Sequence, residues 1–247
     1  MNELVRDPRT LCEEQQLLAR CMDQQSSMAN RSQACLTLGT RRSRTAVPSL
    51  LGLMSLGNLG LAYDASRALA QIGSRTATKP LLRLLRQNRG TALEGAIIST
   101  LSALRDERAR RAFLYLLFHA TSDSVRALAA QALMFLPGRK NAQQALFSAL
   151  ADPAPIVRWS VINTLSRTVA AADLGVLNNH VRDDCKVEEL PDRPTVGSAA
   201  VAVLEEIRAS QNTTEYSAGH FEREGSRWEN GAIAGRTGAS PGIRAPG

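Results

Sequence analysis

The feature that most constrains this sequence is a helical pattern that recurs about every 32 residues. In the full pattern an apolar residue is followed by small residues four and seven positions later and by an apolar residue at eight, and the copies that begin at residues 61, 93 and 196 are weaker and the first, at 31–35, is degraded. The plainest copies are VRALAAQAL at residues 125–133 and VRWSVINTL at residues 157–165. The last apolar positions of the six copies are residues 35, 69, 101, 133, 165 and 204. This spacing places the side chains on one helix face, where small residues let a second helix approach closely.

A break and a second helical segment follow each copy. The breaks are Gly39, Gly73, Arg105-Asp106, Pro137-Gly138 and Arg167-Thr168, and glycine suits the left-handed position that ends many helices. The expected second helices are residues 46–54, 78–86, 108–118, 142–151 and 171–177. One helix pair cannot bury its apolar face alone, whereas stacked pairs share a continuous core. The predicted fold is therefore all-α, an α-solenoid (superhelix) of about six helical hairpins over residues 31–210.

The two ends and one internal segment depart from the repeat. Asp7-Pro8 is a favourable helix start, so residues 1–30 are expected to form an N-terminal cap helix region. The polar stretch 180–194 lengthens the last repeat step and is interpreted as an insertion. Residues 211–247 contain seven glycines and two prolines without aliphatic periodicity, which predicts a disordered tail.

Composition narrows the class of protein further. Aromatic residues make up only 4% of the 247 residues, which is low for an all-β chain. No apolar run approaches the length of about 18 residues needed for a membrane span, and residues 1–7 lack the pattern of a secretory signal. The four cysteines form no C-x-x-C pair, so we expect reduced thiols and a cytoplasmic location.

The repeats resemble a known family through three stretches, residues 65–73, 123–133 and 150–158. Their phase, period and Val-Arg pair are similar to HEAT-like repeats of the short variety associated with phycobiliprotein lyases. The resemblance implies a solenoid in which Arg126 and Arg158, beside Asp123 and Asp152, form a structural ladder between neighbouring repeats. It implies no single activity, because the family includes scaffolds, adaptors and a few enzymes.

Charge is concentrated in the middle of the chain. Residues 31–150 hold 17 Lys and Arg but only 5 Asp and Glu, and such an excess attracts anionic partners. In a solenoid the turns after the small-residue helices lie along one side, here called the basic turn edge. Its candidate partner-binding residues are Arg41, Arg42, Arg44, Arg75, Arg105, Arg108, Arg139 and Lys140. The alternative is a solvated edge whose cations only stabilise helix C-termini.

Two aromatic residues share one repeat position. Tyr63 and Trp159 both lie two residues after the first apolar residue of their copies. Exposed in a concave groove, they would be candidate partner-binding residues for a peptide or helix. The alternative is that each ring packs across the stack.

No motif predicts catalytic, cofactor-binding or metal-binding residues. None of the three histidines precedes a glutamate, whereas the similar HEAT-like deoxyhypusine hydroxylases need His-Glu pairs for iron. His180, Asp183, Asp184 and Cys185 lie in one polar segment that we expect to be solvated. The question of an enzymatic activity stays open, and the sequence favours a non-enzymatic scaffold or adaptor that binds an acidic or peptide partner. The alternatives are a nucleic-acid-binding protein and an auxiliary enzyme resembling a bilin lyase.

Overall fold

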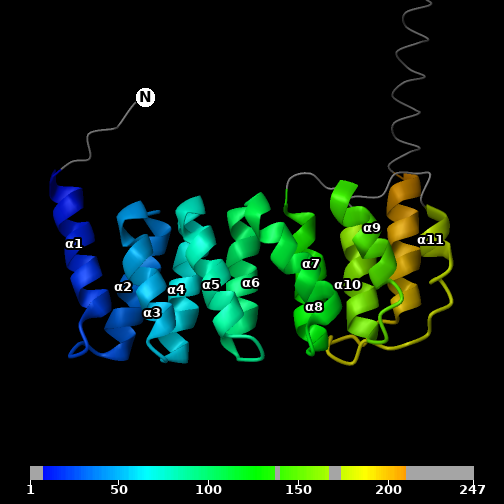
Figure 1. The fold of residues 1–247 in the computed structure, drawn as a ribbon, viewed down its shortest axis with the longest axis horizontal. Coiled ribbons are helices and arrows are strands. Elements are labelled where there is room, and N and C mark those ends of the chain that lie inside the picture. Colours follow the sequence, from blue (N-terminus) through cyan, green and yellow to red (C-terminus); the bar gives the residue numbers. More distant parts are fainter. Residues whose placement is uncertain (1–7, 137–139, 167–173, 210–247) are drawn as a thin grey trace, which may run out of the picture.

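The computed structural model describes residues 8–136, 140–166 and 174–209. Helix pairs stand side by side in an elongated row, with each chain segment antiparallel to the next (Figure 1). The first helices of the pairs are α2 (Met28–Thr40), α4 (Leu59–Ile72), α6 (Leu93–Leu104), α8 (Asp123–Met134) and α10 (Pro155–Leu165). The second helices are α3 (Val47–Ser55), α5 (Thr78–Gln87), α7 (Arg110–His119), α9 (Lys140–Ala149) and α11 (Leu174–Asn178). Helix α1 (Pro8–Met22) precedes the pairs and packs on α2, and a last helix spans residues 196–209.

The first helices contact one another in chain order and form one layer, against which the second helices pack. Alanines at the small-residue positions allow this close approach, since Ala34, Ala65, Ala68, Ala129 and Ala132 are all buried. Leucines fill the remaining space and join all pairs in one core cluster. The repeating pattern in the sequence therefore becomes a single continuous core.

Short 3₁₀ turns lead into three of the second helices. They are Arg44–Ala46 before α3, Arg75–Ala77 before α5 and Glu107–Ala109 before α7. The last residue of each turn is an alanine with no exposed surface. A repeated Arg-Thr-Ala triplet at residues 44–46 and 75–77 is a signal in the sequence for this feature.

Local chemistry sets several helix ends. Asn58 caps α4, because its side-chain oxygen accepts a 3.0 Å hydrogen bond from the Leu61 backbone N–H. Gly73 ends the same helix in the left-handed conformation, with a φ of 67°. Arg105 ends α6 in that conformation too, with a φ of 49°, which is costly for a residue with a side chain.

The prediction that the helix ends at Gly39 is wrong. Helix α2 continues to Thr40, and the residue with positive φ in the following turn is Arg42, at 51°. A Cβ at Gly39 would lie 2.7 Å from the Cα of Ala68 on α4. This glycine is required because two helices approach each other here, and the sequence pattern alone does not separate that role from a helix end.

The all-α solenoid is confirmed over the part of the chain that the structure describes, where the one β feature is an isolated bridge between Lys186 and Thr195. That part contains five helix pairs and the first helix of a sixth. The expected breaks at 137–138 and 167–168 and the expected tail at 211–247 lie outside it. Across the described residues, no helix has both the length and the apolar character that crossing a bilayer requires.

Candidate functional site

The turns that follow α2, α4 and α6 lie along one edge of the row of helices, as predicted for the basic turn edge (Figure 1). Arg42, Arg44 and Arg75 are exposed there, and none of them forms an ion pair with another described residue. Arg139 lies outside the described residues, and Lys140 is placed only by its backbone at the start of α9. The described turns therefore present guanidinium groups to solvent.

Two arginines of the same edge bind within the protein. Arg41 pairs with Glu13 of α1 at 2.7 Å, with 43% and 56% of the two side chains exposed. Arg108 pairs with Asp106, and its Nη2 donates a 2.9 Å hydrogen bond to the carbonyl oxygen of Arg75 in the neighbouring turn. These contacts reduce the charge available to a partner at Arg41 and Arg108.

Asp106 anchors the Arg108 contact in the protein. The residue is buried, and one carboxylate oxygen accepts a 2.8 Å hydrogen bond from the Thr78 hydroxyl. Hydrogen bonds from Arg108 hold the pKa of Asp106 at about 2, against the effect of burial. The carboxylate is therefore charged at neutral pH and links the turns before α5 and α7.

A groove opens beside Arg105, between α6 and α8. Its volume is about 450 Å³, and its floor includes Ile98, Leu128 and Ala132. At its end, the Arg105 guanidinium lies 5.8 Å from the ring centroid of Phe135, which is 40% exposed. This α6–α8 groove joins an apolar floor to a cation of the basic turn edge, a combination that suits a partner with an apolar side chain beside a carboxylate.

Tyr63 and Trp159 contact the protein itself. The Tyr63 hydroxyl donates a 2.6 Å hydrogen bond to the carbonyl oxygen of Ala92, immediately before α6. Trp159 is half-buried and packs on the core cluster. Ala127, at the same repeat position, is buried. The contacts of this position favour packing across the stack, although 40% of Tyr63 stays exposed.

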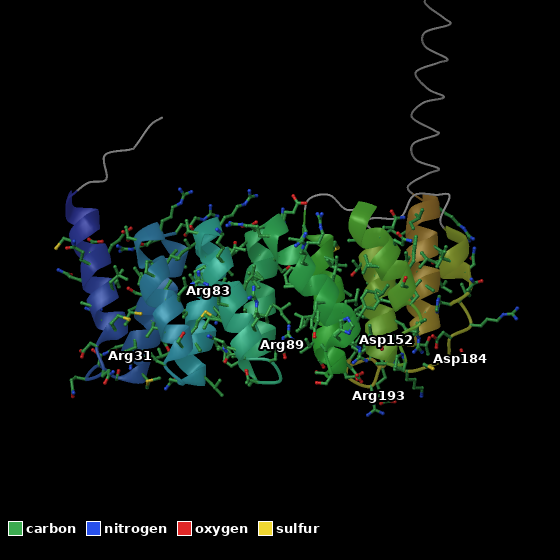
Figure 2. The ribbon with its side chains drawn as sticks, in the orientation of Figure 1. Arg31, Arg83, Arg89, Asp152, Asp184 and Arg193 are labelled. Carbon is green, nitrogen blue, oxygen red and sulfur yellow. The ribbon has the colours of Figure 1, made fainter. Side chains whose placement is uncertain are left out.

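The opposite edge carries the aspartate–arginine ladder. Arg126 Nε donates to Asp152 Oδ2 at 2.8 Å, and Arg126 Nη2 bonds Asp123 Oδ1 at 2.8 Å. The hydrogen bonds that Arg126 donates to Asp152 raise the pKa of Arg126 more than burial lowers it. Figure 2 shows Asp152 at the same lower edge as Arg89 and Asp184.

The next contact of the ladder uses a residue that the sequence interpretation placed in a solvated segment. Arg158 Nε donates to Asp183 Oδ2 at 2.8 Å, and both side chains are mostly buried. Burial raises the pKa of Asp183, but hydrogen bonds from Arg158 and Cys185 outweigh it and lower the pKa. The expectation of a solvated side chain was wrong for Asp183, because this carboxylate pairs with Arg158. The signal in the sequence was the 25-residue separation of the two residues, which is close to the 26-residue separation of Arg126 and Asp152.

Within the described residues, no three His, Cys, Asp or Glu side chains gather in a way that could hold a metal ion. His180 Nδ1 lies 4.0 Å from Asp183 Oδ2, and that carboxylate is already committed to Arg158.

Comparison with known proteins agrees with the repeat architecture. The model of the HEAT repeats matches residues 14–102, 60–134 and 110–190. In sequence, the chain is 31% identical over 137 residues to the bilin biosynthesis protein PecE of Mastigocladus laminosus. That match covers 55% of this chain and 50% of PecE, so the chain spans about half the length of this curated relative.

Among solved structures, the chain is similar to a chain in the complex of CpcE and CpcF of phycocyanin lyase from Nostoc sp. PCC7120. The TM-score is 0.52 at 21% identity, and the match covers 65% of this chain and 98% of that chain. The likeness concerns the fold. Because the repeat matches run from α1 into the segment that holds Asp183, and the described helices stack in pairs over this length, the chain belongs to the HEAT-repeat family.

Proposed function

We propose that this protein is a HEAT-repeat scaffold or adaptor that binds a protein partner through the α6–α8 groove. The observation that carries the proposal is the groove itself, about 450 Å³ in volume, with an apolar floor and an exposed Phe135 beside Arg105. Aromatic and arginine side chains that are desolvated when a partner binds are typical of the residues that dominate protein interfaces.

The charge distribution supports an acidic partner. Arg105 at the groove and the exposed Arg42, Arg44 and Arg75 all belong to the turns that follow α2, α4 and α6, along one edge of the row of helices (Figure 1). Cations in this arrangement attract carboxylates and hold them in bidentate geometry. The four free thiols support a cytoplasmic setting for this role.

The similarity to PecE supports a second candidate, an auxiliary role in bilin biosynthesis. In this role the chain binds a protein partner, as CpcE and CpcF bind each other in the complex that contains the chain of similar fold.

Co-purification tests the first candidate. The tagged chain is isolated from its own cells beside two variants, Phe135→Ala and the control Leu56→Ala, which removes an exposed apolar side chain outside the groove. We expect a partner in stoichiometric amount with the wild-type and Leu56→Ala chains and its loss with Phe135→Ala. Retention of the partner by a folded Phe135→Ala chain contradicts a role for the groove.

Two added reagents separate the alternatives. Mixing the chain and its co-purified partner with a bilin and an apo-phycobiliprotein tests the auxiliary role, which predicts a change in bilin absorbance. A duplex DNA titration at increasing salt tests the nucleic-acid alternative, which predicts strongly salt-dependent binding. Tight, salt-dependent binding of DNA that excludes the protein partner contradicts the scaffold proposal.

A further inference from the structure

A second groove lies between α5 and α7, in the other helix layer from the α6–α8 groove. Its volume is about 290 Å³, and its floor includes the side chains of Leu82, Leu85 and Leu116. Four arginines line it: Arg86, Arg89, Arg108 and Arg111. Among the described residues, no acidic side chain lines this α5–α7 groove, so its surface is apolar at the floor and cationic around it.

Most of this positive charge is not neutralised within the protein. Of the four arginines, only Arg108 joins an ion pair among the described residues, with Asp106. Arg86, Arg89 and Arg111 are exposed. The Arg89 guanidinium lies 4.5 Å from the ring centroid of Tyr115, which holds it beside the groove. Figure 2 shows Arg89 at the lower edge, with Arg83 higher on α5.

The arginines stand at the two ends of the groove. Helices α5 and α7 occupy the same position in successive pairs and run in the same direction (Figure 1). Arg111 is the second residue of α7, as Lys79 is the second residue of α5, and Arg86 follows Lys79 by seven residues. At a rise of 1.5 Å per residue, the two cationic ends are separated by about 10 Å along the helix axes, with the leucines between them.

We propose that the α5–α7 groove binds an acidic amphipathic helix of a protein partner. Two carboxylates seven residues apart in that helix reach Arg86 and Arg111, and apolar side chains between them cover the leucine floor. The inference rests on the proposed role in binding proteins and adds a second docking surface in the opposite layer. An aliphatic floor favours a peptide over nucleic acid, whose phosphate backbone carries no apolar group to bury.

A defined peptide tests this assignment. The probe is a fluorescein-labelled, side-chain-cyclised helical peptide with Glu at two positions seven apart and Leu three and four residues after the first. Two control peptides replace either both Glu by Lys or both Leu by Ser. We expect salt-sensitive binding of the probe, measured by fluorescence anisotropy, and weak or absent binding of both controls. Equal binding of the Leu-to-Ser peptide contradicts a role for the floor.

Matched protein variants locate the probe. The double variant Arg86→Gln/Arg111→Gln removes one cation from each end of the groove. The double variant Arg20→Gln/Arg67→Gln removes the same charge at exposed positions elsewhere. We expect the first to weaken binding by roughly tenfold or more, and the second by about twofold or less. An equal loss of affinity in both variants means that the probe binds to net charge alone, and this result overturns the proposal. Displacement of the probe by duplex DNA, with an affinity for the probe that is unchanged in Arg86→Gln/Arg111→Gln, overturns it as well.

Failure of the α5–α7 groove proposal is distinguishable from failure of the scaffold proposal. If the partner from cells still binds in a Phe135-dependent way but the peptide binds neither groove, the second surface is wrong and the scaffold role stands. If no partner binds but the peptide requires Arg86 and Arg111, the α5–α7 groove stands and the α6–α8 proposal fails.

Discussion

Arg126 joins two repeats by donating hydrogen bonds from Nε and Nη2 to the two carboxylate oxygens of Asp152, at 2.8 and 3.0 Å. Only 12% and 10% of the two side chains are exposed. Nη1 also donates to the carbonyl oxygen of Ala120 at 3.0 Å, so the guanidinium ties the end of one pair to the start of the next. In a solenoid, where each repeat contacts only its neighbours, such contacts set the stability of each boundary.

We therefore expect Arg126→Gln to destabilise the protein by about 2–3 kcal/mol, because Asp152 loses a charged partner in a poorly solvated place. Arg41→Gln is the matched control, since its pair with Glu13 is about half exposed on both sides. That substitution should cost about 0.5 kcal/mol or less. Urea denaturation followed by circular dichroism measures both. Equal effects in the two variants contradict a structural role for the ladder.

Two glycines in helices make an opposed pair of predictions. Gly39→Ala places a Cβ 2.7 Å from the Ala68 Cα, and the two helices must move apart, which costs about 1–3 kcal/mol. Gly52→Ala on α3 meets no atom within 4 Å and should stabilise by about 0.5–1 kcal/mol. Thermal melting of both variants tests the close approach of α2 and α4. An unchanged melting temperature in Gly39→Ala would show that this approach is looser.

Gly73 and Arg105, which end α4 and α6 in the left-handed conformation, give a further pair of predictions. Gly73→Ala should cost about 1 kcal/mol from backbone strain alone, because its Cβ would meet nothing within 4 Å. Arg105→Gly should instead stabilise by up to about 1 kcal/mol, since the native φ of 49° already strains this residue. The same variant removes the cation at the α6–α8 groove, so we expect higher melting temperature together with weaker partner binding. A lower melting temperature for a folded Arg105→Gly chain contradicts this explanation.

Acid should weaken the Asp106 contact in a defined range. The pKa of Asp106 is about 2 in the folded protein and about 4 in an unfolded chain, so its contribution is present above pH 4 and is lost as the pH falls towards 2. We expect about 1–2 kcal/mol at neutral pH, allowing for the exposed Arg108. Asp106→Asn lacks this dependence. The gap in unfolding free energy between wild type and variant should therefore narrow from pH 5 to pH 2, and a constant gap contradicts the pKa assignment.

The cysteines divide into two reactive and two protected thiols. Cys12 and Cys185 are exposed, whereas Cys21 and Cys35 are buried, with their Sγ atoms 2.9 Å apart between α1 and α2. Their hydrogen bond lowers the pKa of Cys21 and, with burial, raises the pKa of Cys35. A thiol reagent should label two cysteines in the folded protein and four after denaturation. Two after denaturation would mean that Cys21 and Cys35 are oxidised.

Much of the fold could be predicted from the sequence, because the same pattern of apolar and small residues recurs in successive repeats. The small residues at 65, 68, 129 and 132 predict helix-on-helix packing, and the structure buries all four. The role of Gly39 was predicted wrongly, since glycine occurs both at helix ends and where two helices approach closely. The role of Asp183 was also predicted wrongly. Its polar neighbours indicated a solvated segment, and only its separation along the chain from Arg158 matched the aspartate–arginine ladder.

The candidate site was less predictable for a physical reason. A sequence places Arg105 and Arg108 in adjacent turns, but it does not show that Arg108 binds Asp106 while Arg105 lies over Phe135. Likewise, Arg86 and Arg111 belong to different repeats, and only the stacking of α5 and α7 brings them to one groove. Binding surfaces in a solenoid arise between repeats, where periodicity carries little information.

Hydroxyl-radical footprinting of the chain alone and in the complex from its own cells tests the α6–α8 groove most directly. We predict that oxidation of Phe135 falls several-fold in the complex, while Leu56, which is 57% exposed and lies outside the groove, keeps its reactivity. Unchanged oxidation of Phe135 in a stoichiometric complex would contradict the proposal that a partner binds there.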